Sequence, residues 1–149
     1  MALCLAVSFG ASAQEYNRWV PTKTEADELR GTTAHTSWSY MTKDMLILYT
    51  EGSVGISMSK GIFDYESDYS GYTPKKTAKV LVGTYVDGLL VNRVFYEFRV
   101  SQGGDIGTIN GSAGKELIGF LESKCDVRFV IERFAGATLD VTIPGRGIR

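Results

Sequence analysis

Most of the chain alternates apolar and polar residues with the period of two that is typical of β-strands. The alternation predicts strands at residues 34–40, 45–50, 54–59, 61–65, 79–86, 89–100, 108–109, 127–132 and 139–143. Asp87-Gly88 predicts a type I′ hairpin turn, because both central residues of that turn need positive φ. In the stretch that follows the turn, both faces carry bulky residues. This indicates either a central strand or one that passes from the core to the rim.

Helical periodicity is confined to two segments. An apolar stripe predicts a helix over residues 112–124, with Ser112 as its N-cap. Residues 24–31 predict one or two helical turns that end at Gly31. Residues 66–77 are polar and are predicted to form a long exposed loop.

The order of these elements predicts the fold class. Short turns join neighbouring strands and no strand–helix–strand alternation is present, so the sheets should be antiparallel. We expect a mainly β fold, either an antiparallel β-sandwich or a partly open barrel, with one helix in the C-terminal half. The length of 149 residues fits a single domain, which we place at residues 14–149.

The first residues are predicted to lie outside that domain. Residues 2–13 are an apolar run that ends in Ala11-Ser12-Ala13, the A-x-A pattern of a signal-peptide cleavage site. We therefore expect a signal peptide at residues 1–13 and a periplasmic or secreted domain; the alternative is a buried strand or helix. No Lys or Arg precedes the run, so we expect either a misplaced start codon or a truncated N-terminus. We expect no transmembrane segment in the mature chain.

Charge and composition exclude several classes of protein. The chain has 16 Lys plus Arg and 17 Asp plus Glu, a net charge of -1, which gives no electrostatic reason to expect nucleic acid as a partner. One His and two Cys are too few for a usual zinc site, and we expect no metal or other cofactor. After the predicted cleavage only Cys125 remains. We expect it to be a small, buried hydrophobic residue at the edge of a strand, with pairing to a second chain as the alternative.

Three short matches to catalytic or phosphate-binding motifs lack the context that each chemistry needs. Residues 57–60 have the S-x-x-K spacing of penicillin-recognising enzymes, but they lie in a strand pattern that puts Ser and Lys on opposite faces. Gly114-Lys115 lacks both the upstream Gly and the following Ser or Thr of a P-loop. His35 and Cys125 have no recognisable sequence context for a nucleophile and its base. We therefore expect the protein not to be an enzyme.

One segment combines acidic and aromatic residues in an extended pattern. The candidate ligand or partner contacts are Asp64, Tyr65, Glu66, Asp68, Tyr69 and Tyr72. Alternation places the three carboxylates on one side, where hard oxygen ligands suit Ca²⁺, although the EF-hand spacing is absent. Exposed tyrosines also stack on sugars. The simpler alternative is a solvated acidic segment, but a loop of this kind is where we expect a partner to bind.

Several short stretches carry a resemblance to known proteins. They are Trp19, Asp27-Glu28-Leu29-Arg30-Gly31, Gly61-Ile62-Phe63-Asp64, Val82-Gly83-Thr84-Tyr85 and the closing Ile143-Pro144-Gly145. In this layout the chain resembles small exported bacterial β-domain proteins of unassigned function. More loosely, its C-terminal half is similar to periplasmic accessory domains, such as those associated with type six secretion or with invasion-associated locus B. Those families keep disulfide cysteines that this chain lacks, and the resemblance supplies no catalytic residue.

Two functions follow as expectations. The first is an exported, non-enzymatic β-domain that binds a protein or surface partner in the cell envelope, either an envelope protein or a glycan. The alternative is a carrier of a small hydrophobic ligand. Its cavity would lie between the sheets, lined by residues such as Phe95, Phe98 and Phe129.

Overall fold

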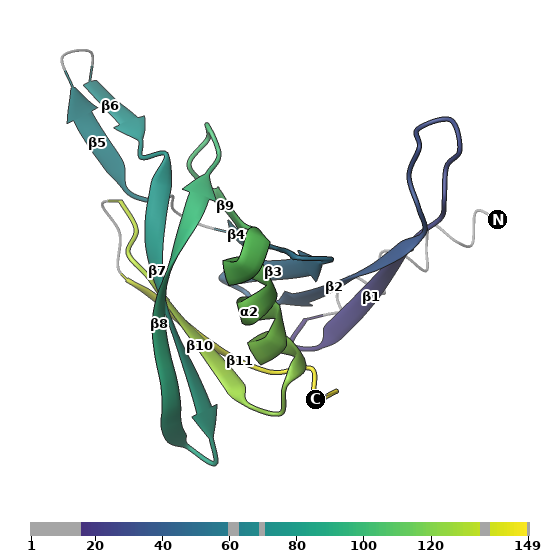
Figure 1. Ribbon diagram of the computed structural model, residues 1–149. Helices are drawn as coiled ribbons and strands as arrows, with labels where there is room; N and C mark the ends of the chain where they lie inside the picture. The colour runs from purple at the N-terminus through teal and green to yellow at the C-terminus, as the bar shows by residue number, and fades with distance from the viewer. Residues whose placement is uncertain (1–15, 60–62, 69–70, 135–137, 149) are drawn as a thin grey trace.

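The computed structural model describes residues 16–59, 63–68, 71–134 and 138–148, with the backbone alone described for residues 65–68 (Figure 1). The predicted signal peptide therefore lies outside the described residues. In the described part of the chain, no helix has both the length and the apolar character needed to cross a membrane.

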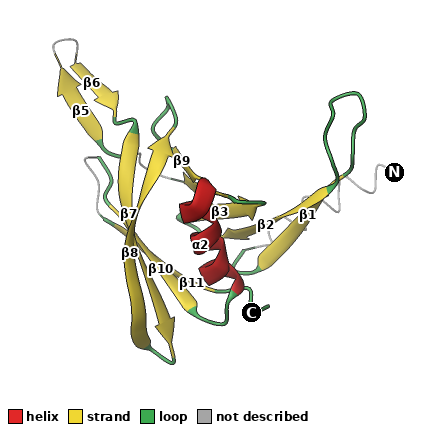
Figure 2. Cartoon of the chain, in the orientation of Figure 1, coloured by secondary structure: helices red, strands yellow, loops and turns green. Residues whose placement is uncertain are grey.

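Nine antiparallel strands form the main sheet, in the order β1-β2-β3-β4-β9-β8-β7-β10-β11 (Figures 1 and 2). Their bounds are β1 (Trp19–Thr24), β2 (His35–Met41), β3 (Met45–Thr50), β4 (Ser53–Met58), β7 (Thr77–Val86), β8 (Leu89–Val100), β9 (Ile106–Ile109), β10 (Asp126–Ile131) and β11 (Leu139–Pro144). The predicted mainly β, antiparallel fold is confirmed. Its strands lie in one sheet that is not closed, which corresponds to the partly open alternative.

The core lies on one face of the main sheet, under the helix α2 (Gly111–Glu122). Alternate residues of the strands are buried there, as the period-two pattern predicted. Leu117 and Leu121 of α2 have no exposed surface and pack against them. The helix predicted at 112–124 is confirmed, but it begins one residue earlier: its N-cap is Asn110, not Ser112, and Asn110 makes no side-chain capping hydrogen bond.

Three local predictions are wrong. The first is the strand at residues 61–65, because residues 61 and 62 lie outside the described residues, 63 and 64 are not in a strand, and the next strand begins only at Tyr65. Residues 24–31 do not form a helix: β1 runs to Thr24, and a tight turn follows. In that turn the Asp27 carboxylate accepts the backbone N–H of Leu29 and of Arg30, at 3.0 and 3.3 Å, a local bond that competes with helix formation.

The polar residues 66–77 do not form a loop throughout. They contain most of a separate two-stranded sheet, β5 (Tyr65–Asp68) with β6 (Gly71–Pro74), and β7 begins at Thr77. This hairpin projects away from the main sheet (Figure 1). It has no apolar alternation because it does not cover the core, so hydrophobic periodicity alone does not indicate it.

The predicted hairpin turn at Asp87-Gly88 is confirmed, and a second tight turn joins β3 to β4. Asp87 and Gly88 have φ of 51° and 80°, as a type I′ turn requires. Thr50 pairs with Ser53 across the turn between β3 and β4. There Gly52 has φ of 73°, a backbone conformation that favours glycine.

The two edge strands of the sheet, β1 and β11, meet at one point. Trp19 on β1 donates its indole N–H to the carbonyl of Pro144 at the end of β11, at 2.8 Å. The Trp19 ring also lies edge-on to the rings of Tyr40 and Tyr49, with centroids 5.4 and 5.7 Å apart. The indole hydrogen bond thus joins the two edges where no strand ladder does, and the packing against Tyr40 and Tyr49 holds the indole in place.

A mostly buried charged cluster lies beside this point. Arg146 donates from Nε to the Tyr49 hydroxyl at 2.8 Å, and its guanidinium carbon lies 3.7 Å from the ring centre of Trp38. Its NH2 nitrogen is 3.6 Å from Oε2 of Glu122, which also accepts the Tyr49 hydroxyl at 3.1 Å. The Arg146 and Glu122 side chains are only 15% and 12% exposed. Burial raises the pKa of Tyr49, so the cluster holds a neutral phenol between two charges.

Residues 145–148 complete the C-terminal end of α2. The last carbonyls of a helix have no partner within it. Here three backbone N–H groups donate to these carbonyls, at 2.6 to 2.9 Å. Arg146 donates to the carbonyl of Leu121, Ile148 to the carbonyl of Glu122, and Gly147 to the carbonyl of Ser123. The positive charge of Arg146 also lies at the end of the helix that favours cations.

Candidate partner-binding surface

The predicted contact residues lie on or beside the β5–β6 hairpin. Asp64, before β5, forms an ion pair with Lys75, after β6, at 2.7 Å. Tyr72 is 66% exposed, and its ring centre is 5.5 Å from that of Phe134. The hairpin therefore displays Tyr72, while Lys75 offsets the charge of one of the acids.

The other predicted contacts cannot be placed as side chains. Tyr65, Glu66 and Asp68 lie in β5, where Tyr65 pairs with Pro74 and Glu66 with Thr73, and only their backbone is described. Tyr69 lies outside the described residues.

A second surface is formed by β8, which sequence patterning did not single out as a site. On one side β8 pairs with β7 from Arg99 to Leu89. On the other side its partner is β9, and that pairing covers Arg99 and Val100 alone. Among the described strands, none pairs with this second edge of β8 between Leu89 and Phe98. The strand passes from the core to the rim, one of the two alternatives indicated by its sequence.

The backbone of β8 presents hydrogen-bonding groups at this open edge. Val100 donates its N–H toward β7, to the carbonyl of Lys76 at 2.8 Å. In an antiparallel ladder, successive residues direct their N–H and C=O to opposite edges. Arg93, Phe95 and Glu97 therefore direct theirs to the open edge, on the same side on which Arg99 meets β9. The N–H of Arg93 donates there to Oδ1 of the neighbouring Asn92, at 2.9 Å. An edge of this kind can accept an added strand.

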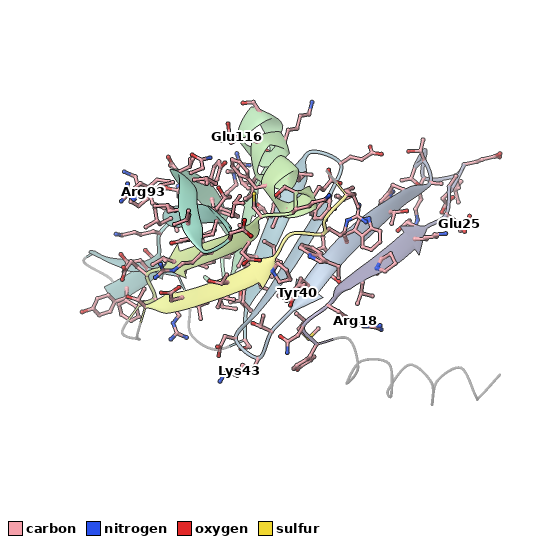
Figure 3. The ribbon with its side chains drawn as sticks, turned by 90° about the horizontal axis from the view of Figure 1, so that it is seen from below. Arg18, Glu25, Tyr40, Lys43, Arg93 and Glu116 are labelled. Carbon is pink, nitrogen blue, oxygen red and sulfur yellow. The ribbon has the colours of Figure 1, made fainter. Side chains whose placement is uncertain are left out.

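Large apolar side chains surround the open edge. The exposed ones on the β7–β8 hairpin are Val86 (44%), Leu89 (70%), Leu90 (52%), Val91 (58%) and Phe95 (55%). Exposed apolar groups gathered on one element are typical of interaction sites. The guanidinium carbon of Arg93 lies 5.1 Å from the ring centre of Phe95. Arg93 is at the opposite end of the molecule from Glu25 (Figure 3).

A groove accompanies the edge on the side of α2. A pocket of about 380 Å³ is lined by residues of β8 and by the start of α2, among them Phe95, Glu97, Asn110 and Ala113. Tyr96 closes its inner side, with its hydroxyl donating to Oε1 of Glu116 at 2.6 Å. The backbone edge at Phe95 and Glu97 thus borders open space.

The hydroxyl of Tyr96 makes the stability of the fold depend on pH in the alkaline range. Burial, and then its hydrogen bond to Glu116, raise the pKa of Tyr96 well above the ordinary value of about 10. The stability linked to this group is therefore fully present below pH of about 10 and is lost as the pH rises, because the unfolded phenol ionises first. We expect the free energy of unfolding to fall less between pH 9 and 11 in Tyr96→Phe than in the wild type, measured by urea denaturation. Tyr72→Phe is the control, and an equal fall in all three proteins would contradict the expectation.

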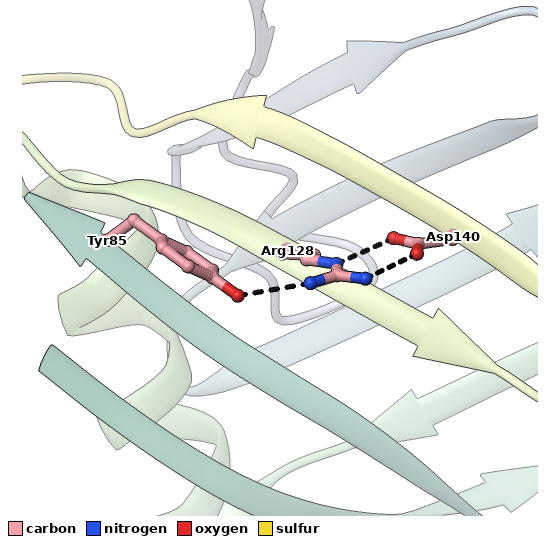
Figure 4. Close-up of polar contacts among 3 residues, drawn as sticks. All are labelled: Tyr85, Arg128 and Asp140. Carbon is pink, nitrogen blue, oxygen red and sulfur yellow. Dashed lines mark hydrogen bonds and ion pairs between the residues drawn. The ribbon is translucent and has the colours of Figure 1, made fainter. Parts of the chain in front are cut away.

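The outer face of the neighbouring strands carries a surface ion pair. Arg128 of β10 donates from Nε and NH2 to the two carboxylate oxygens of Asp140 on β11, at 2.8 and 2.6 Å (Figure 4). From NH1 it donates to the Tyr85 hydroxyl on β7, at 3.1 Å. The hydrogen bonds from Arg128 lower the pKa of Asp140. Because the groups are exposed, the pair contributes little stability, but it spans the three strands that support β8.

The residues considered for the alternative functions are dispersed. Phe98 and Phe129 are fully buried in the core, whereas Phe95 is on the outer side, so these three do not line a common cavity. Cys125 lies at the edge of a strand, as expected, directly before β10, but it is half-buried rather than buried. His35 begins β2, with Nδ1 3.2 Å from the carbonyl of Thr33.

The exposed apolar tip of the β7–β8 hairpin, unlike the open edge, had a signal in the sequence that the period-two pattern did not reveal. Leu89, Leu90 and Val91 are consecutive apolar residues directly after a hairpin turn, where alternation would have put a polar residue.

No protein-family model, curated protein or solved structure matches the chain.

Proposed function

We propose that this chain is an exported, non-enzymatic domain that binds another protein by adding a strand to the open edge of β8. The observation that carries the proposal is the edge itself, with the backbone groups of Arg93, Phe95 and Glu97 directed outward beside exposed Phe95. Strand addition uses main-chain hydrogen bonds for affinity and alternate side chains for specificity. It needs a polypeptide, so the proposal favours a protein over a glycan. The signal-like residues 2–13 support export.

A random library of extended nine-residue peptides provides the test. We expect selected peptides to alternate apolar residues and to slow amide hydrogen exchange at Arg93, Phe95 and Glu97. Phe95→Pro should abolish this binding, because proline removes an outward N–H and is tolerated on edge strands. Phe95→Thr is the control, since it keeps the N–H and should retain binding.

Two results would contradict the proposal. One is a set of peptides that protects other residues, such as those of the β5–β6 hairpin. The other is unchanged peptide binding by the Phe95→Pro variant, provided that the circular dichroism spectrum of this variant shows that it is folded.

A further inference from the structure

We infer that the strand added at this edge is β8 of a second copy of the chain, paired antiparallel about a two-fold axis at Phe95. The inference rests on the proposed function and names its partner. In a two-fold interface the same patch must be complementary to itself. The open segment of β8 meets that requirement in both its backbone and its charges.

The backbone restricts the ways in which two β8 strands can pair. Arg93, Phe95 and Glu97 direct their N–H and C=O outward, and hydrogen-bonded pairs of an antiparallel ladder join residues of this kind. An axis at Phe95 pairs Phe95 with Phe95 of the second copy. Arg93 then pairs with Glu97 of the second copy, and Glu97 with its Arg93. All three outward-facing positions can be hydrogen-bonded in this register, and at Arg93 the N–H then exchanges its present acceptor, Oδ1 of Asn92 at 2.9 Å, for a carbonyl of the second copy.

The charges favour this register over its neighbours. With the axis at Phe95, opposite charges face each other on both sides of the central rings, an arrangement that stabilises cross-strand pairs. An axis at Arg93 or at Glu97 brings like charges together, and an axis at Val94 makes no ion pair. Within its own chain, Arg93 lies across from Gly83, which has no side chain, whereas Glu97 lies across from Lys79, a cation that competes with the Arg93 of the second copy.

The shape of β8 is compatible with the pairing. The segment from Arg93 to Glu97 stops short of Arg99, where β9 occupies the edge. In the second copy, Arg99 and its β9 would come opposite Val91. At that point the pairing of β8 with β7 skips one residue, since Thr84 pairs with Asn92 and Tyr85 with Leu90. Such a bulge bends the strand at the point where it would meet β9 of the other copy.

Charge reversal tests both the partner and the register. We expect the purified wild-type chain to dimerise in sedimentation equilibrium. Arg93→Glu and Glu97→Arg should each weaken the dimer about tenfold or more, because each places like charges across both pairs. An equimolar mixture of the two variants should recover a dimer of near wild-type affinity, since every Glu then faces an Arg. Lys43→Glu, on the turn between β2 and β3, is the control and should leave the dimer unchanged.

Each other outcome overturns the inference. A chain that stays monomeric but whose β8 amides are protected by library peptides has a different strand partner, and the proposed function stands. A monomer whose β8 edge binds no peptide contradicts both. A dimer that the mixed variants fail to restore uses another register or face. Circular dichroism and thermal unfolding of each variant distinguish loss of pairing from loss of fold.

Discussion

Replacing Arg146 by alanine should lower the free energy of unfolding by about 3 kcal/mol, measured by urea denaturation. The Arg146 side chain is nearly buried against Trp38 and contacts Glu122, which is equally shielded from water. Removing one partner of a buried ion pair leaves the other charge in a poorly solvated site, at a cost of about 3–5 kcal/mol. We place the loss at the lower end because both side chains keep some exposure.

Arg30 supplies a matched control for this prediction. It also forms an ion pair, with Asp27 at 3.5 Å, but its side chain is 80% exposed. Exposed pairs contribute about 0–1 kcal/mol, so Arg30→Ala should change stability by less than about 1 kcal/mol. The double variant Arg146→Leu/Glu122→Leu should be more stable than the sum of its single changes, because it leaves no unpaired charge. Equal losses in Arg146→Ala and Arg30→Ala would contradict a buried role for the cluster.

The second large effect concerns Gly114 and Gly119, two glycines of α2. A Cβ at Gly114 would lie 2.5 Å from the carbonyl oxygen of Gly52 and 3.1 Å from that of Ile109. Both are backbone atoms, and Gly52 lies in a tight hairpin turn, so neither can move aside cheaply. Gly114→Ala should therefore destabilise the fold by about 1–3 kcal/mol or more through overpacking.

Gly119→Ala should change stability in the opposite direction. A Cβ there meets nothing within 4 Å, and alanine favours a helix over glycine by about 1 kcal/mol. Thermal unfolding of the two variants side by side measures the difference, since helix propensity contributes equally to both. If Gly114→Ala were also stabilising, the close approach of α2 to the β3–β4 turn would be wrong.

The hairpins were predictable because neighbouring residues alone specify the turn and the strands on either side of it. Asp87-Gly88 specifies its turn by backbone conformation, and the strands on either side alternate toward the core. The same holds for β10 and β11, where every second residue packs under α2. In contrast, β1 has polar residues from Thr22 to Thr24 and lies at an edge, so its identity depends on pairing with β2.

The candidate surface was not predictable for a different reason. The open edge of β8 exists because β9 is four residues long and pairs with β8 at only two of them. Strand order is a property of contacts between distant segments, and residue alternation carries no information about it. The acidic segment at Asp64 was found from composition, whereas the β8 edge required knowing which strand lies beside it.

The position of β9 also affects how the chain can fold. Strands β1 to β4 form one series of sequence-local hairpins, and the pairs β7–β8 and β10–β11 are local as well. Only the pairings of β9 with β4, of β9 with β8 and of β7 with β10 unite these parts, and the β4–β9 and β7–β10 contacts join residues far apart in sequence. Such contacts raise the contact order and slow folding, because loop closure must precede the gain in pairing. Without β9, the strands β4 and β8 would each have a long unpaired edge open to other chains.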